Sequence, residues 1–584
     1  MIMPRSPKTA SGVPPWGVFP AAAPSLLKDL PIFIAGLALF YGLLTFARYG
    51  VGPVNTQAEI HLYPGALPKY ALFSVARIAI AYFLSLAFTL VYGYVAAYDP
   101  RAERIMVPLL DILQSIPVLS FLPPVMMAMI GLFPHSQLGA ELGCILLILT
   151  GQVWNMTFSF YSSLKNIPRD LHEAAEIYQL NWWQRLWQME IPYAAIGLIW
   201  NSIMSVAGAW FFLMACEMFV LGNRDMRLPG LGSYLQTAAN AGDTRAIAWG
   251  VGLMVAIIVL IDQMVWRPVI VWADKFKFEQ VEAAVPPRSP ILDLLRHSKI
   301  ISFAARVSVK PAREALNLYF AKAGAKSKDL PRKSPFTPWA WRALMLAGLV
   351  AIAYAVVRMG QMLVALSGPE IKGIVRGAAA TFLRVEGTLV LAGLWTIPVG
   401  VYVGMRAKLS ALVQPLAQIA ASVPATALFP IVLLMLIRVG GGMGIGSMAL
   451  LLLGTQWYLL FNVIAGASAI PTDLKEVCGV FRLGNLERWR KLFLPAIFPY
   501  LITGFITASG GAWNASIVAE YFHFQGKTLS TVGLGAVISH ATDTGNFRVL
   551  LAATICMAAM VVTLNRLVWR RLYGLASTKF KLET

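Results

Sequence analysis

Charged side chains inside apolar segments are the first candidates for chemistry in this sequence. Two arginines and two glutamates stand at matching places, Arg77 with Glu217 and Arg384 with Glu520. An ionised group inside an apolar segment is costly to insert, so such groups usually face the protein interior or a polar cavity. The arginines therefore have three interpretations: they add positive potential to a path for anions, they pair with the glutamates, or they extend toward lipid head groups.

Two polar segments, 168–192 and 471–495, are the second candidates. Each has an aspartate followed three residues later by a glutamate, the spacing of an N-cap residue and its capping-box partner. Each predicts a short amphipathic helix that ends before the proline at its close. Such a helix suits docking in a groove of a partner or lying on lipid head groups, and capping alone would also explain the glutamates. The residues are Asp170, Glu173 and Pro192 in the first segment and Asp473, Glu476 and Pro495 in the second.

Most catalytic chemistry finds no candidate residues. A phosphate-binding loop needs Gly-x4-Gly-Lys-Ser/Thr, and the nearest match, Gly526-Lys527-Thr528, has Tyr521 where the first glycine belongs. The glycine-rich run 440–446 lacks the preceding strand of a dinucleotide site. The four cysteines are isolated, and the six histidines show no ligand spacing. We therefore expect no enzyme, no ATP site and no metal site in this chain.

The composition places the chain in a membrane. Of 584 residues, 58% are hydrophobic and 13% charged, whereas soluble domains carry about a quarter charged residues. Disorder and a disulfide scaffold are excluded as well. The net charge of +20 is spread between apolar runs instead of clustered on one face, so we expect contact with membrane lipid and none with nucleic acid.

Apolar runs long enough to cross a bilayer recur along the whole sequence. A span needs roughly 20 apolar residues in a helix, and a lipid-facing backbone must satisfy its own hydrogen bonds. The fold class is therefore all-α and polytopic, with about twelve transmembrane helices. The predicted spans are 31–49, 71–97, 107–132, 138–163, 194–221 and 247–272 in the first half, and 341–366, 379–404, 411–437, 446–468, 496–520 and 549–572 in the second.

Lysine and arginine in the short loops predict the orientation, because they are enriched on the cytoplasmic side. The loops near 101–104, 165–169, 406–408 and 475–491 are rich in cations, whereas 133–137 has none. The loop 222–246 holds three arginines and argues locally against this orientation. The pattern predicts an inner-membrane protein with both termini in the cytoplasm.

The two halves repeat one another at an offset of 303 residues. Gly208-Ala209-Trp210 recurs as Gly511-Ala512-Trp513, each followed by a glutamate and then by Gly-Leu-Gly at 230–232 or 533–535. Six spans per copy give both copies the same orientation, so a pseudo-two-fold axis should run along the membrane normal, with a pathway between the halves. The predicted domains are a cytoplasmic tail 1–30, a first repeat 31–272, a basic cytoplasmic linker 273–340 and a second repeat 341–584. The linker is either a solvated tether or a regulatory, lipid-attracted module.

The polar segments resemble the cytoplasmic loop of the membrane subunits of bacterial ATP-binding-cassette (ABC) importers. That loop carries Glu-Ala-Ala, a glycine six residues after the glutamate, and Ile/Leu-x-Leu-Pro at its end. The chain has Glu173-Ala174-Ala175 and Ile191-Pro192 in the first copy, and Glu476 with Leu494-Pro495 in the second, while Gln179 and Arg482 replace the glycine. The resemblance implies that each segment is a coupling helix seated in a cleft of an ATPase subunit.

A finer resemblance points to the nitrate/sulfonate/taurine type of permease. It lies in the Trp-x6-Glu and Gly-Leu-Gly motifs and in the proline-rich segments 117–124 and 424–430. It implies two copies of a cytoplasmic ATPase that bind ATP and Mg, an extracytoplasmic solute-binding protein, and a small anion as solute. The implied coupling residues are Asp170, Glu173, Ala174, Ala175, Arg185 and Pro192 in the first copy, and Asp473, Glu476, Arg482, Gly484, Arg488 and Pro495 in the second.

Prolines in the third spans predict where a solute passes, because unwound backbone is tolerated in a membrane where it lines a cavity. Kinks that merely suit helix packing are the alternative. The candidate path residues are Arg77, Pro117, Pro123, Met126, Met127 and Glu217, with Arg384, Pro424, Pro430, Met435 and Glu520. Other functions stay open: a ferric-iron or thiamine-type fused permease, an ion-gradient-driven secondary transporter, and a membrane scaffold that transports nothing.

Overall fold

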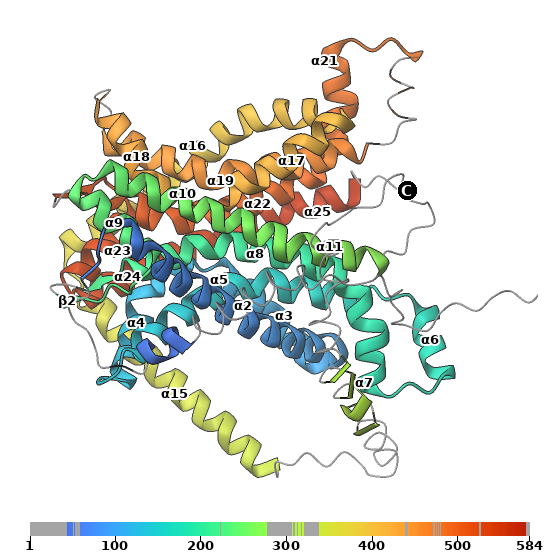
Figure 1. Cartoon of the computed structure of the whole chain (residues 1–584), viewed down its shortest axis with the longest axis horizontal. Helices are drawn as coiled ribbons and strands as arrows, with labels where there is room; N and C mark the ends of the chain where they lie inside the picture. The colour runs from blue at the N-terminus through green and yellow to red at the C-terminus, as the bar shows by residue number, and fades with distance from the viewer. Residues whose placement is uncertain are drawn as a thin grey trace, which may run out of the picture.

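The structure is a computed structural model that describes most of the two halves. The described residues are 44–50, 52, 59–221, 224–276, isolated positions between 306 and 319, 338–438, 442–470, 474–524 apart from 475, 477 and 479, and 527–579. The predicted tail, most of the predicted linker and most of the predicted span 31–49 lie outside them. The described part is almost entirely helical (Figure 1).

The first half consists of long apolar helices joined by short elements. A two-stranded hairpin and a short helix connect α8 to α10 at one end, and α6 and α7 connect α5 to α8 at the other (Figure 1). The elements are η1 (Pro64–Ala66), α2 (Leu67–Tyr98), α3 (Pro100–Ser115), η2 (Val118–Phe121), α4 (Leu122–Leu132), α5 (Leu138–Lys165), α6 (Arg169–Ile177), α7 (Trp182–Arg185), η3 (Leu186–Glu190), α8 (Ile191–Glu217), β1 (Val220–Leu221), β2 (Arg224–Asp225), α9 (Leu231–Ala241), α10 (Thr244–Ile261), η4 (Asp262–Trp266), α11 (Arg267–Ala273) and η5 (Asp274–Phe276).

The second half repeats this order. Its hairpin is antiparallel and pairs Tyr521 with Ser530. The elements are α15 (Pro338–Val364), α16 (Gly368–Gly404), α17 (Ala407–Ser422), α18 (Ala425–Arg438), α19 (Met443–Ser468), α21 (Asn485–Arg488), η7 (Trp489–Phe493), α22 (Leu494–Ala519), β3 (Tyr521–Phe524), β4 (Lys527–Ser530), α23 (Leu534–Asp543), α24 (Phe547–Leu564), η8 (Asn565–Trp569) and α25 (Arg570–Lys579).

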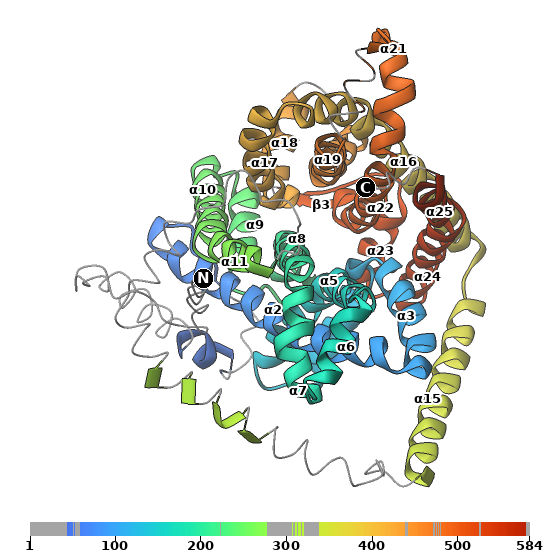
Figure 2. The same ribbon diagram turned by 90° about the vertical axis from the view of Figure 1, so that its right-hand side faces the viewer.

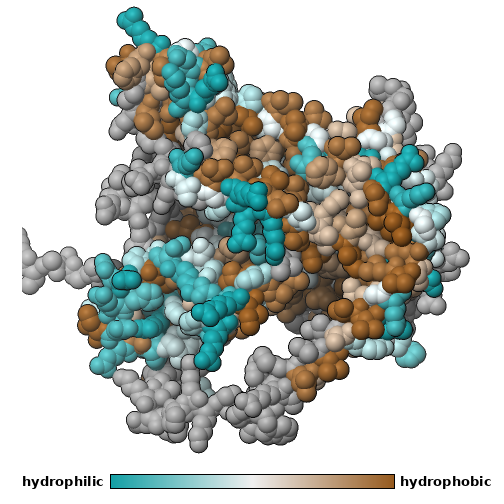
Figure 3. Space-filling model, turned by 180° about the vertical axis from the view of Figure 1, so that it is seen from behind, coloured by the Kyte–Doolittle hydropathy of each residue, from teal (hydrophilic) through white to brown (hydrophobic). Residues whose placement is uncertain are grey.

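Eight helices among the described residues are long and apolar enough to cross a membrane. They correspond to eight of the twelve predicted spans, and α15 covers a ninth, 341–366. Their outward faces carry large apolar side chains (Phe83 is 66% exposed and Leu394 67%), as expected where lipid is the solvent. Figure 3 shows hydrophobic side chains over much of one face, with a large hydrophilic group at the end that carries α6, α7 and α21 and smaller ones near the middle and at the opposite end. The eight are Pro64–Tyr98, Leu138–Lys165, Trp182–Glu217, Thr244–Ala273, Gly368–Gly404, Met443–Ser468, Asn485–Ala519 and Phe547–Ala576.

The prolines predict interrupted third spans, and the structure breaks each span at one of them, whereas Pro123 and Pro430 lie within α4 and α18. In the first half α3 ends at Ser115, and the chain passes through η2 before α4 begins. In the second half α17 and α18 meet at 79°. Both breaks fall directly before a proline, Pro117 or Pro424, because the residue before a proline is pushed out of the helical conformation.

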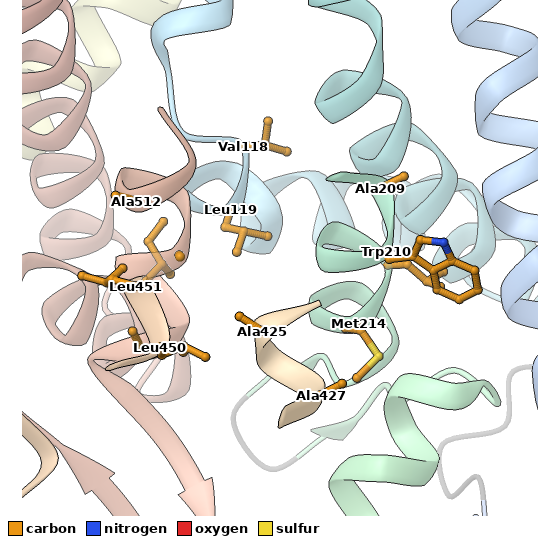
Figure 4. Packing of buried hydrophobic residues seen from close by; sticks show 14 of the residues in the cluster. Val118, Leu119, Ala209, Trp210, Met214, Ala425, Ala427, Leu450, Leu451 and Ala512 are labelled. Atoms are coloured by element: carbon orange, nitrogen blue, oxygen red, sulfur yellow. The ribbon is translucent and has the colours of Figure 1, made fainter. Parts of the chain in front are cut away.

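These broken segments pack across the boundary between the halves. The backbone N–H of Leu119 in η2 donates to Asn514 Oδ1 of α22 at 3.4 Å, and Thr554 Oγ1 of α24 donates to the carbonyl of Ser120 at 3.3 Å. In Figure 4, Leu119 lies beside Leu451 and Ala512 of the second half. In the same view the segment of α18 that carries Ala425 and Ala427 lies near α8 of the first.

Reciprocal contacts give the two halves a pseudo-two-fold relation. The helix α10 of the first half packs against α17 of the second, and α24 of the second packs against α3 of the first. Since α24 is the counterpart of α10, and α17 that of α3, each half offers the same pair of elements to the other (Figure 2). This arrangement is the one expected of parallel repeats.

Close helix packing within the second half depends on glycines in α16. A Cβ on Gly404 would lie 2.6 Å from the carbonyl oxygen of Ile464 and 2.7 Å from Ala467 Cβ, both on α19. At Gly387, on the same helix, the nearest atom is Met448 Cε at 3.8 Å, which is ordinary van der Waals contact. Small residues let membrane helices approach closely enough for dispersion contacts to hold them together.

We therefore expect Gly404→Ala to destabilise the bundle by about 1–3 kcal/mol, the usual cost of overpacking. Gly387→Ala is the matched control and should cause no loss, because its Cβ has room. The measurement is the melting temperature of the detergent-solubilised chain. Equal melting temperatures for the two variants would contradict the packing described here.

Candidate functional site

A fully buried ion pair occupies the first half at the end away from α6 and α7. Arg77 on α2 donates through Nη1 to Glu217 Oε1 at 2.7 Å. Its Nε and Nη2 donate to the two oxygens of Glu141 on α5 at 2.7 and 2.6 Å. The side chains of Arg77 and Glu217 have no exposed surface. Two charges removed from water in this way are stable only when they are paired and hydrogen-bonded.

The same glutamate holds the start of α9. Glu217 Oε2 accepts the backbone N–H of Gly232 at 2.7 Å. Ser74 Oγ donates to Glu217 Oε1 at 2.6 Å and accepts the N–H of Leu231 at 2.9 Å. A Cβ on Gly230 would lie 2.2 Å from the carboxylate carbon, so only glycine allows this approach. We call these residues, Ser74, Arg77, Glu141, Glu217 and 230–232, the Glu217 clamp.

The second half builds a matching arrangement. Arg384 on α16 pairs with Glu520 at the end of α22. Glu520 Oε2 accepts the N–H of Gly535 at 2.8 Å, while Thr381 Oγ1 donates to Glu520 and accepts the N–H of Leu534 at 2.7 Å. A Cβ on Gly533 would lie 2.0 Å from Glu520 Oε2. We call Thr381, Arg384, Glu520 and 533–535 the Glu520 clamp.

These clamps explain the Trp-Glu and Gly-Leu-Gly motifs of the sequence. The glutamate ends a long helix and ties it to the short helix that begins at Gly-Leu-Gly. Ser74 and Thr381 were missed as site residues, although each stands three positions before the arginine in its half. Glu141 was missed because nothing in the second half repeats it.

Both arginines pair with glutamates in the structure. Of the three interpretations of the arginines, the structure therefore supports pairing over a free positive charge or contact with lipid head groups. Arg77 is neutralised by two carboxylates and has no exposed surface. It therefore presents no free positive charge. Arg384 has one carboxylate and keeps 11% of its side chain exposed.

The first polar segment folds as two short helices joined by a turn, and its start differs from the prediction. The helix α6 begins after Pro168 and has no side-chain cap, so Asp170 is not the N-cap residue. The capping box lies farther along, where Asn181 Oδ1 accepts the N–H of Gln184 at 2.8 Å and Gln184 Oε1 accepts that of Asn181 at 3.0 Å. Glu173 is exposed instead of serving a cap.

The turn after α6 has the geometry for which the importer family uses glycine. Gln179 has φ of 50° and Arg482, its counterpart, 48°, and they are the two non-glycine residues with positive φ in the described part of the chain. The N–H of Leu180 donates to the carbonyl of Ala175 at 2.9 Å, and that of Leu483 to Cys478 at 3.1 Å. Both are Schellman-type helix ends. Gln179 and Arg482 therefore adopt the left-handed conformation that glycine adopts most readily.

The prediction that the segment's helix ends before Pro192 or Pro495 is also wrong. The second short helix runs through a π turn, Leu186–Glu190 in one half and Trp489–Phe493 in the other, directly into α8 or α22. Each π turn ends two residues before the proline, which lacks the N–H of a regular helical turn. Movement of the segment would therefore pass into a membrane-spanning helix without an intervening loop.

The second polar segment places its coupling candidates at the same end. Glu476, Arg482 and Gly484 are exposed, and Glu487 Oε2 accepts the N–H of Gly484 at 3.3 Å. Asp473 lies outside the described residues. In the first segment Ala175 is buried, whereas Ala174 and Arg185 are half-buried. Arg488 of the second segment is half-buried as well. Both segments extend from one end of the molecule, beyond the long helices (Figure 1).

The tips of the two segments expose apolar side chains. Ile177 and Tyr178 are 79% and 78% exposed, and their counterparts Val480 and Phe481 are 80% and 72% exposed. Exposed apolar groups on a polar loop are typical of a surface that contacts a partner.

The predicted path residues of the third segments occupy mixed environments. Pro117, Pro123 and Pro424 are buried. Met126 is fully buried and packs on α5 near Gly143, Met127 is half-buried, and Met435 is 63% exposed. The side chain of Pro430 is not described. Their part in a solute path stays a prediction.

Comparison with known proteins identifies relatives of both halves. The profile of the family described as "Binding-protein-dependent transport system inner membrane component" matches residues 89–262 and again 396–573. The nitrate import permease protein NrtB of Leptolyngbya laminosa is 27% identical over 34% of this chain and 67% of its own length. The bicarbonate transport system permease protein CmpB of Synechococcus elongatus is 28% identical over 34% and 68%. The putative aliphatic sulfonates transport permease protein SsuC of Bacillus subtilis is 22% identical over 36% and 73%.

We expect Gly230→Ala or Gly533→Ala to displace the clamp glutamate and lower stability by about 3 kcal/mol, the lower end of the cost of breaking a buried pair. Gly252→Ala on α10, with no atom within 4 Å of its Cβ, is the control and should cause no loss. Melting of the solubilised chain measures both. If the clamp variants had the same melting temperature as the control variant, the result would contradict the close approach of these glycines to the glutamates.

Substitution at Gln179 tests the turn. Gln179→Gly should keep the loop intact, whereas Gln179→Val should open it, because a β-branched residue is strained at positive φ. The rate of tryptic cleavage at Arg185 reports the change. Equal rates for the two variants would contradict the turn geometry.

Proposed function

The chain belongs to the family of binding-protein-dependent transport system inner membrane components, and on this premise we propose how its two halves act together in one importer. It is a permease component of an ABC importer, a transport subunit and not an enzyme. Because the family profile matches twice, one polypeptide supplies two permease halves.

We propose that the two polar segments, 168–192 and 471–495, bind the ATPase. The observation that carries this proposal is the pair of matching loops at one end of the bundle, each with a left-handed turn and an exposed apolar tip. Each loop continues through a π turn into α8 or α22. Closure of an ATPase dimer would therefore move both helices.

The arrangement of charges supports a cytoplasmic location for this end. Lys165 Nζ lies 2.8 Å from Glu103 Oε2, so the cation-rich loops after α2 and α5 lie together. Hydrogen bonds from Lys165 and Tyr161 lower the pKa of Glu103, which keeps this contact ionised. By the positive-inside rule this end faces the cytoplasm, and we place both termini there.

The partners follow from this orientation. Two copies of a cytoplasmic ATPase, which bind ATP and Mg, would each take one loop. An extracytoplasmic binding protein would meet the opposite end, where α9, α23 and the two hairpins lie. The inner membrane of a bacterium is the location that fits these partners.

The solute class is proposed from the relatives. Their names give nitrate, bicarbonate and aliphatic sulfonates, which are all small oxyanions, so we propose a small oxyanion here. The two matching loops favour an ATP-driven importer over an ion-gradient-driven secondary transporter, which would need no surface for an ATPase.

Charge placed at the loop tips tests ATPase docking. The double variant Tyr178→Asp with Phe481→Asp should lose the ATPase subunit that co-purifies with the wild-type chain, by roughly tenfold or more, since apolar anchors dominate such interfaces. Arg245→Glu, an exposed change at the opposite end, should retain it. The measurement is ATPase recovered per permease. Full recovery with the double variant, or no ATPase recovered with the wild type, would contradict the proposal.

A further inference from the structure

The two clamps differ in one respect that bears on what the chain binds. Arg77 donates to two carboxylates and to the carbonyl of Pro229 at 2.9 Å. Arg384 donates to one carboxylate, to the carbonyl of Val532 at 3.0 Å and to Thr531 Oγ1 at 3.4 Å. The second clamp therefore has one acidic partner fewer than the first.

The missing partner is the counterpart of Glu141. The offset of 303 that aligns Gly143 with Gly446 and Gly151 with Gly454 places Gly444 opposite Glu141. A Cβ on Gly444 would lie 3.9 Å from Thr531 Oγ1, the atom that Arg384 Nη2 contacts, and no atom of the described residues would lie nearer. A side chain at 444 would thus point toward the guanidinium, and glycine leaves that direction open.

The edge of Arg384 that faces this opening is short of acceptors. In the first clamp, Nε and Nη2 of Arg77 hold the two oxygens of Glu141 side by side. In the second clamp no described residue accepts from Nε, while both N–H groups of Nη2 are in use, on the carbonyl of Val532 at 3.0 Å and, more weakly, on Thr531 Oγ1 at 3.4 Å. The side chain of Arg384 keeps 11% of its surface exposed, against none for Arg77.

The net charges of the two clamps also indicate that the second clamp lacks one anionic group. The Glu217 clamp holds one arginine and two glutamates, which is a net charge of −1. The Glu520 clamp holds one of each and is neutral. A monovalent anion on Arg384 would give the second clamp the composition of the first.

We propose that the Nε and Nη2 edge of Arg384 binds a small oxyanion, which displaces the long Thr531 Oγ1 contact from Nη2 and takes the place that the Glu141 carboxylate occupies on Arg77. The ligand presents two oxygens on one edge, as nitrate, bicarbonate and a carboxylate do, because the guanidinium fork matches that spacing. The proposal rests on the proposed function, since the site lies at the proposed extracytoplasmic end of the bundle, where an imported solute would enter. It gives the duplicated chain one such site.

Placing the first clamp's carboxylate in the second clamp tests this. Gly444→Glu should supply a carboxylate that accepts from Arg384 and so abolish anion binding. Gly442→Glu is the control: it adds the same charge two residues earlier, where no described atom lies within 4 Å of the Cβ. Arg384→Lys keeps the charge but loses the fork. The probes are sodium nitrate and sodium bicarbonate, with sodium chloride at equal ionic strength as the reference. The readout is the melting temperature of the full chain in nanodiscs.

Nitrate or bicarbonate should raise the melting temperature of the wild type and of Gly442→Glu above that in chloride. Apparent affinity should fall roughly tenfold or more in Arg384→Lys, since a charge-assisted hydrogen bond is lost, and the shift should vanish in Gly444→Glu. An undiminished shift in Gly444→Glu, or no shift in the wild type, would overturn the site. ATPase recovery from the same preparations separates this result from the proposed function: a shift without ATPase would refute docking and leave the anion site standing.

Discussion

A charge buried in an apolar bundle must be paired, and this constraint organises the end of the molecule where α9 and α23 lie. Arg77 and Arg384 lie on membrane-spanning helices, and each is met by a glutamate at the end of another long helix. The glutamate then uses its second oxygen to hold a Gly-Leu-Gly turn. The buried arginine of each half therefore ties together long helices, α2, α5 and α8 in the first half and α16 and α22 in the second, and the short helix that begins at Gly-Leu-Gly.

At the opposite end the polar segments continue directly into long helices. There the polar segments leave the bundle, turn at Gln179 or Arg482, and re-enter as α8 or α22. The same two helices carry Glu217 and Glu520 at their far ends. A displacement imposed on the loops would be transmitted along a single helix to the clamps, which links the proposed ATPase surface to the proposed anion site.

Much of this was predictable, because the repeat and the apolar runs are properties of residue type and spacing. The all-helical fold and the duplication are confirmed, and the Trp-Glu and Gly-Leu-Gly motifs mark the clamps. The prolines predicted the interruption of the third spans, which the structure places before Pro117 and Pro424 but not at Pro123 or Pro430. The expected cap at Asp170 was wrong because α6 begins at Arg169 with Pro168 as its N-cap residue, which places Asp170 inside the first turn. Glu141 had no signal, as its contact with Arg77 joins residues 64 apart on different helices.

The central claim is that two parallel halves present both loops on one side of the membrane. Single cysteines at Ile177 and Val480, in a background with the four native cysteines replaced, test it by reaction with a membrane-impermeant maleimide. Both should react in inverted vesicles and neither in right-side-out ones. Reaction of either position from the outside would contradict the account, because the two halves would then no longer share one orientation.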